Sequence, residues 1–196
     1  MTLIVSENID EVENNLKMGK FACPTCLSPL KRHGHGRSRL IWSCGGTKIE
    51  ITPRRGRCDK CRKTQVLLPE ILFIRRTYTA EVIGGALLDN AEGISANLIA
   101  KKLDIPFMTV RGWLRRFKKK ADGIAKEFMS LALSLNASLN EVSPTGSKFK
   151  DAINAIGLAI EAYRVRLGDL KHWSMVSRVT KGALLLTRVQ LYETPP

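Results

Sequence analysis

The sequence has no run of about 18 apolar residues, the length that a helix needs to cross a bilayer, so we expect no membrane-spanning segment. Its first residues are acidic rather than basic, which is not typical of a signal peptide. We therefore expect a cytoplasmic protein. Because that compartment keeps thiols reduced, metal binding is the first expectation for the five cysteines, ahead of disulfides.

Acidic residues are also scarce, with 18 Asp and Glu against 32 Lys and Arg, for a net charge of +14. Such an excess does not determine a fold, but it favours a polyanionic partner. Nucleic acid is the first candidate and an anionic membrane surface is the second. Aromatic residues make up only 6% of the chain, which leaves few side chains to stack on unpaired bases. RNA is therefore a weaker alternative than duplex DNA.

The clearest chemical pattern is two Cys-x-x-Cys pairs with 31 residues between them. Each short loop can place two thiolates on one metal, and four thiolates complete a tetrahedral zinc site. We predict one structural Zn²⁺ with the ligands Cys23, Cys26, Cys58 and Cys61. Cys44 is interpreted as a small buried hydrophobe or a free thiol, and His33 and His35 are alternative zinc ligands.

Short strand patterns accompany the cysteines. Residues 40–42 and 48–52 flank Gly45-Gly46, a pair that can adopt the positive φ angles of a hairpin turn. A third strand is expected at residues 65–68. Together these features predict a zinc ribbon over residues 21–70. Its basic residues Arg54, Arg55 and Arg57 lead into the second cysteine pair, where a rigid loop would present them to phosphate.

Residues 93–117 have the pattern of two short helices joined by a tight turn. Ser95 can cap the first helix, and Pro106 suits the start of the second. Asp104 occupies the turn position where glycine is usual because the backbone there needs positive φ. With a supporting helix before it, this pattern predicts a three-helix helix-turn-helix domain at 78–120. The alternative is a plain helical hairpin.

The outer face of the second helix is basic, since residues 101–120 contain eight Lys or Arg and one Asp. A solvated face usually mixes charges of both signs. Arginine can bind a guanine edge through two hydrogen bonds, and apolar side chains can contact a thymine methyl group. We predict base-reading roles for Phe107, Met108, Arg111 and Arg115. We predict phosphate contacts for Arg54, Arg55, Arg57, Lys101, Lys102, Arg116, Lys118 and Lys119.

Two segments flank these domains. Residues 1–20 are acidic, and we interpret them as a loosely ordered arm or short helix, in its simplest form a solvated tail. Residues 121–190 are expected to form a helical hairpin or bundle. It has an apolar seam at Phe149, Ile153, Ile156, Ile160, Tyr163 and Leu167, preceded by an apolar series that ends at Leu139. The bundle either packs within the chain or forms a homodimer. The expected fold class is mostly α with a small β zinc ribbon.

The order of the motifs resembles the N-terminal zinc-binding and DNA-binding region of bacterial insertion-sequence transposases, and that of small uncharacterised bacterial helix-turn-helix proteins. The resemblance covers about residues 21–120. It implies binding to the terminal repeats of a mobile element or to a related operator. In the transposases a catalytic domain follows, with three carboxylates that hold two magnesium ions. Here the later carboxylates lie on helical patterns, so we expect no enzyme.

These observations predict a zinc-stabilised, sequence-specific protein that binds double-stranded DNA and is associated with the nucleoid. It would act as a transcriptional regulator or as a mobile-element-associated factor. One alternative is a truncated or accessory transposase subunit without its own catalytic domain. A further alternative is a zinc-ribbon protein adaptor, which failure to bind any DNA at low salt would favour.

Overall fold

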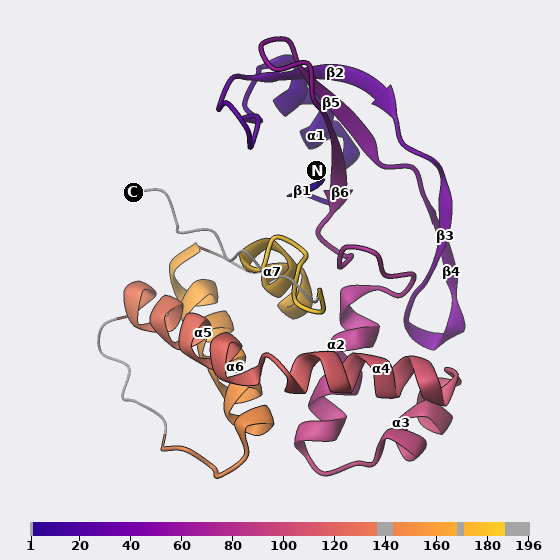
Figure 1. Cartoon of the computed structure of the whole chain (residues 1–196), viewed down its shortest axis with the longest axis vertical. Coiled ribbons are helices and arrows are strands. Elements are labelled where there is room, and N and C mark those ends of the chain that lie inside the picture. The colour runs from indigo at the N-terminus through magenta and orange to yellow at the C-terminus, as the bar shows by residue number, and fades with distance from the viewer. Residues whose placement is uncertain (1, 137–142, 168–170, 187–196) are drawn as a thin grey trace.

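The computed structural model describes residues 2–136, 143–167 and 171–186. Figure 1 shows most strands and the first helix at one end of the molecule and the helices α2–α6 (within residues 80–167) at the other, with the last helix, α7 (His172–Val179), between them. The described residues form two β-sheets and seven α-helices, so the architecture is mixed α/β. None of the helices in these ranges combines the length and the apolar character needed to cross a bilayer.

The larger sheet has four strands in the order β1-β6-β5-β2. These strands are β1 (Thr2–Val5), β2 (Leu30–His35), β5 (Arg54–Cys58) and β6 (Thr64–Pro69). β1 runs parallel to β6, whereas the other neighbours are antiparallel. The strand predicted at 65–68 corresponds to β6.

The predicted hairpin is confirmed. β3 (Arg39–Trp42) pairs antiparallel with β4 (Lys48–Ile51), and a short 3₁₀ turn, Cys44–Gly46, joins them. Gly45 and Gly46 have φ angles of 67° and 71°, which glycine adopts without steric cost. The hairpin extends from the larger sheet towards the helices (Figure 1). Its buried Ile41 packs with Leu68 and Leu72.

Among the interpretations of residues 1–20, the short helix is confirmed and the solvated tail is wrong. β1 adds a strand to the larger sheet, and the short helix α1 (Ile9–Lys17) follows it, capped by the Asn8 side chain. Val12 and Leu16 of α1 are buried in one cluster with Leu30 and Leu67. The acidic residues of α1 obscured this apolar pair, whose spacing of four places it on one helix face.

Six helices form the rest of the described chain. They are α2 (Ala80–Ala91), α3 (Ala96–Leu103), α4 (Phe107–Lys118), α5 (Ala121–Leu135), α6 (Lys148–Leu167) and α7 (His172–Val179). The Thr79 hydroxyl accepts from the Val82 amide, and the predicted Ser95 cap accepts from the Leu98 amide at 3.4 Å. Each hydroxyl satisfies a backbone donor that the first helical turn leaves unpaired.

The helices from α2 to α7 share one hydrophobic core. The rings of Phe117 on α4 and Phe149 on α6 lie 4.7 Å apart between centroids, which joins the predicted three-helix unit to the later helices. In the predicted α6 seam, Phe149, Ile153, Ile156 and Ile160 are buried and Tyr163 is partly buried. Leu139 and the Leu167 side chain lie outside the described residues. Most of the seam thus packs within the chain, and the homodimer stays a prediction.

Candidate metal centre and nucleic-acid interface

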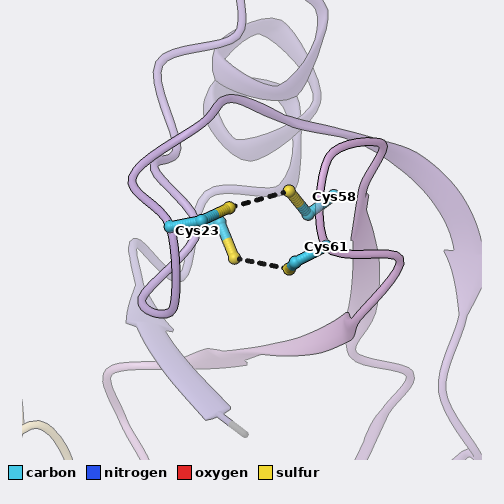
Figure 2. A group of neighbouring side chains, drawn as sticks. Cys23, Cys58 and Cys61 are labelled. Atoms are coloured by element: carbon cyan, nitrogen blue, oxygen red, sulfur yellow. Dashed lines mark hydrogen bonds between the residues drawn. The ribbon is translucent and has the colours of Figure 1, made fainter.

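The four predicted metal ligands come together from two loops of the larger sheet. Cys23 and Cys26 precede β2, whereas Cys58 ends β5 and Cys61 lies in the turn towards β6. Figure 2 shows the side chain of Cys23 facing those of Cys58 and Cys61 across the site. Within the described ranges this is the one grouping of His, Cys, Asp or Glu side chains that could hold a metal ion.

The sulfur positions fit a tetrahedral ion. The Sγ atoms of Cys23 and Cys61 are 3.5 Å apart, those of Cys26 and Cys58 are 3.4 Å apart, and all four lie within 4.8 Å of one another. A zinc ion bound at about 2.3 Å by four sulfurs separates them by about 3.8 Å, a value within this range. Four thiolates also leave no coordination position open, which is typical of a structural site rather than a catalytic one.

The two loops share one backbone design. The Cys23 amide bonds the Ser28 carbonyl at 2.8 Å, and the Cys58 amide bonds the Lys63 carbonyl at 3.0 Å. The residue that follows each Cys-x-x-Cys is left-handed, with φ of 59° at Leu27 and 60° at Arg62. This turn directs backbone amides at the sulfurs. The Cys-x-x-Cys spacing predicted the ligands, but it did not predict the left-handed residue that follows each pair.

Those amides favour thiolates. The Thr25 amide lowers the pKa of Cys23, and the Ser28 amide, followed by the Cys58 thiol, lowers the pKa of Cys26 to about 6. On Cys61 the Lys63 amide also acts to lower the pKa. Desolvation and the neighbouring thiols outweigh it and raise that pKa to about 11. Four thiolates at these distances repel one another, so a bound cation is needed for all of them to be deprotonated together.

The remaining candidate metal residues lie apart from this cluster. Cys44 is an exposed free thiol at the tip of the β3–β4 hairpin, so the free-thiol interpretation is confirmed and the buried hydrophobe is wrong. His33 and His35 are exposed on β2 and do not belong to the four-cysteine group. Neither histidine is placed to replace one of the four sulfurs.

The turn between α3 and α4 has the backbone geometry that the sequence predicts. Asp104 is left-handed, with φ 52° and ψ 47°, and the next amide, that of Ile105, bonds the Ala100 carbonyl at 3.0 Å. Val110 and Trp113 of α4 are buried, and the Trp113 ring meets Tyr78 edge to face at 5.1 Å. This packing holds α4 in a defined orientation against the core.

The predicted base-reading residues share one exposed side of α4. Phe107 and Met108 are 42% and 68% exposed, and Arg111 and Arg115 are exposed on the following turns. Their spacing places them on neighbouring positions of the helix surface. Apolar and guanidinium groups are therefore available together on one surface of the molecule.

The predicted phosphate contacts fall into two groups. Lys101, Lys118 and Lys119 are exposed, Arg55 and Arg57 are half-buried on β5, and Arg116 is half-buried on α4. In the second group, Lys102 pairs with Asp89 at 2.9 Å, and Arg54 pairs with Glu13 at 2.5 Å. We leave Lys102 and Arg54 out of the proposed DNA surface because carboxylates of the protein already neutralise them.

Sequence reasoning missed three charged residues near these sites. Glu13 of α1 is only 13% exposed and pairs with Arg32 as well as with Arg54. Glu13 follows the apolar Val12 directly, and this position next to the buried side of α1 was a signal that Glu13 could be partly buried. Arg75 and Arg76, in the segment before α2, line one cavity with Arg116 of α4, and neither is among the predicted phosphate contacts. Two adjacent arginines next to an aromatic residue were the signal there.

Residues 23–113 match a protein family described as a domain of unknown function (DUF6431). The match begins at Cys23, the first of the four clustered cysteines, and ends at Trp113 in α4. It therefore joins the cysteine sheet and the α2–α4 helices in one sequence unit, without assigning them an activity. No curated protein and no solved structure matches this chain significantly.

The left-handed residue in the α3–α4 turn can be tested by substitution. We expect Asp104→Val to lower the free energy of unfolding by about 1–2 kcal/mol, because a β-branched side chain is disfavoured at positive φ. Asp104→Asn should stay within about 0.5 kcal/mol of the wild type, since Asn tolerates this conformation. Urea unfolding of the metal-loaded protein measures both values. Equal losses in the two variants would contradict the role assigned to the backbone.

Proposed function

We propose that this protein binds double-stranded DNA in a sequence-specific manner and that zinc stabilises its N-terminal part. The observation that carries the proposal is the exposed side of α4, where Arg111 and Arg115 lie beside Phe107 and Met108. The α3–α4 pair then acts as a helix-turn-helix, with α4 in the major groove. The net charge of +14 supports a polyanionic partner.

Zinc is the metal we propose for the four cysteines, in a zinc ribbon. Four sulfurs without an oxygen or nitrogen ligand suit zinc, which accepts tetrahedral thiolate sites. Cys23 and Cys58 belong to the small apolar cluster between α1 and the larger sheet. So small a cluster cannot stabilise the sheet by burial alone, and metal binding would supply part of its folding free energy. The metal is then a structural element and takes no part in a reaction.

Basic residues outside the base-reading group would bind the DNA backbone. Lys101 lies on α3, whereas Lys118 and Lys119 lie at the end of α4, and all three are exposed. Arg55 and Arg57 would extend the contacts from β5. Neutralisation of phosphates releases counterions, so the affinity should fall steeply as salt rises. Such contacts orient the protein but carry little sequence information.

Specificity would come from the α4 side chains. A bidentate contact between an arginine and a guanine edge discriminates by about 1–3 kcal/mol against the wrong base. The Met108 Sδ lies 3.9 Å from the Arg111 Nη1, so the two side chains already lie side by side on the helix. Their proximity would allow one arginine–guanine contact next to one apolar contact with a thymine methyl group.

The decisive experiment removes one of the two exposed arginines. A preferred site is first selected from a random duplex pool with zinc present. We expect Arg111→Ala to lower the affinity for that site about 5- to 150-fold, which corresponds to about 1–3 kcal/mol. The affinity for random duplex should change little. Fluorescence anisotropy at fixed salt measures both affinities.

Arg164→Ala is the matched control, because Arg164 is an exposed arginine near the C-terminal end of α6, far along the chain from α4. It should leave both affinities unchanged. An equal loss on both duplexes in Arg111→Ala would show that Arg111 contacts only phosphate. If the metal-loaded wild type bound no duplex at low salt, the proposal would fail and a protein adaptor would be favoured.

The biological setting we propose is transcriptional regulation or association with a mobile element. Both settings use the same binding chemistry, as does the alternative of an accessory transposase subunit. Terminal repeats or an integrase gene in the genomic neighbourhood would favour the mobile-element settings. Their absence would favour a regulator.

A further inference from the structure

A basic cavity of about 310 Å³ lies between α4 and the segment that precedes α2. Arg75 and Arg76 of that segment and Arg116 of α4 supply its charge, and Tyr78 and Thr109 contribute to its wall. No acidic residue lines it. A cavity with three guanidinium groups and no carboxylate is an unusual arrangement, because positive charges held together repel one another.

Arg76 and Arg116 are half-buried, whereas Arg75 is exposed. Within the described part of the chain, none of them forms an ion pair with a carboxylate. The Arg76 Nη2 donates to the Leu185 carbonyl at 2.9 Å, and the Arg116 Nη1 donates to the Gly112 carbonyl at 2.9 Å. The Arg76 Nε is buried and has no hydrogen-bond partner. These contacts hold the guanidinium groups of Arg76 and Arg116 in place without neutralising them.

A further cation, Lys120, interacts electrostatically with Arg76. Burial, together with the charge of Arg116, lowers the pKa of Arg76. Burial and the charge of Arg76 also lower the pKa of Lys120, although Glu127 acts in the opposite direction. Lys120 donates to the carbonyls of Ala183 and Leu184 at 3.3 and 3.4 Å, which keeps its ammonium group near this region. An anion in the cavity would relieve this repulsion.

The backbone around the cavity is fixed before any ligand binds. Arg75 is left-handed, with φ 59°, a conformation that is sterically disfavoured for arginine. Hydrogen bonds hold the segment on both sides, from the Ile74 amide to the Gly182 carbonyl and from the Trp42 amide to the Thr77 carbonyl, at 2.9 and 2.8 Å. Strained residues that the surroundings hold in place are frequent at ligand sites. The backbone that carries Arg75 and Arg76 therefore needs little reorganisation for an anion to bind.

We propose that Arg75, Arg76 and Arg116 bind a phosphate oxyanion, and that the bound group is a phosphate of the DNA backbone beside the groove that α4 enters. The planar guanidinium group can donate two parallel hydrogen bonds to phosphate oxygens. Met108 also lines the cavity, so the phosphate would lie next to a predicted base-reading residue. This contact would set the position of α4 along the groove. The inference rests on the proposed DNA binding.

The test compares two double variants with the same change in net charge. Arg75→Gln/Arg116→Gln removes two guanidinium groups of the cavity and leaves Arg76, which bonds the Leu185 carbonyl. Arg164→Gln/Arg166→Gln near the end of α6 is the matched control. We expect the cavity variant to lower the affinity for the selected and the random duplex by the same factor. It should also reduce the slope of log affinity against log salt by about 1 relative to the control.

Two further experiments distinguish a phosphate of the DNA backbone from a free phosphate ion. Duplexes with single methylphosphonate substitutions remove one backbone charge at a time. At one position the wild type should lose affinity and the cavity variant should lose none. Calorimetric titration of DNA-free protein with inorganic phosphate tests a free ligand. If phosphate bound to the wild type but not to the variant, and duplex affinity were equal in both, the DNA assignment would be overturned.

Equal behaviour of the cavity and control variants in every arm would overturn the anion site itself. Thermal unfolding confirms that both variants are folded before any comparison. Failure of the proposed function gives a different result, because the wild type would then bind no duplex. The phosphate titration alone would decide whether the cavity takes an oxyanion.

Discussion

Cys58→Ser is expected to abolish stoichiometric metal binding and to unfold the sheet that contains β2, β5 and β6. Cys58 is fully buried and its Sγ lies 3.4 Å from that of Cys26, so its loss removes a ligand from the centre of the site. In small zinc domains the bound ion contributes on the order of 10 kcal/mol to folding. Few apolar side chains are available to replace that contribution.

Zinc content, amide hydrogen exchange and far-UV circular dichroism measure this result. We expect protection to be lost in the larger sheet and kept in α2–α6, because those helices belong to a separate core. A chelator added to the wild type should have the same effect. Cys44→Ser is the matched control, since Cys44 is an exposed cysteine outside the cluster, and it should change neither metal content nor stability.

Two results would contradict the zinc site. If the purified wild type contained no stoichiometric zinc and ignored a chelator, the four-cysteine site would not be a zinc site. If Cys58→Ser and Cys44→Ser behaved alike, the cluster would have no role in stability.

Gly84→Ala is expected to destabilise the helical part, whereas Gly85→Ala one residue later is not. A Cβ added at Gly84 would lie 1.9–2.2 Å from atoms of the buried Trp173 indole, which no close packing tolerates. Overpacking of this kind costs about 1–3 kcal/mol, and sometimes more. A Cβ at Gly85 meets no atom within 4 Å. There alanine should stabilise the helix by about 0.5–1 kcal/mol.

Thermal unfolding separates the two variants by sign. For a chain of this length a change of 1 kcal/mol moves Tm by about 2–4 °C, so Gly84→Ala should melt at least 2 °C lower. Gly85→Ala should melt about 1–4 °C higher than the wild type. A Gly84→Ala/Trp173→Leu double variant should lose less stability than the two single changes added together. Equal melting of the two alanine variants would show that Trp173 does not pack on Gly84.

The difference between Gly84 and Gly85 could not be predicted from the sequence. Both lie in an apolar helical pattern, and nothing in their neighbours distinguishes them. Only the approach of α7 to α2 makes Gly84 necessary, because Trp173 is distant in the chain. The parallel pairing of β1 with β6 has the same character, since Thr2 pairs with Val66. The acidic residues of α1 concealed a different contact, the packing of Val12 and Leu16 on the sheet, although these two residues have helical spacing.

Features that depend on a few consecutive residues, by contrast, can be predicted from the sequence. The Cys-x-x-Cys spacing, the Gly45-Gly46 turn, the Ser95 cap and the positive φ of Asp104 each depend on a few consecutive residues. The structure brings the four cysteines together and confirms the turn, the cap and the backbone angle. The basic side of α4 follows equally from helical periodicity. The DNA-binding function built on it stays a proposal.

By itself, the sequence determined which side chains can hold a metal, where the backbone turns, and which helix presents cationic groups, because spacing and residue type control those properties. Only the tertiary structure decided which cations are neutralised and which are not. Glu13 reaches Arg54 and Asp89 reaches Lys102, whereas Arg75, Arg76 and Arg116 meet without a carboxylate. The physical reason is that ion pairing depends on the distance between charges, and folding sets that distance between segments far apart in the chain.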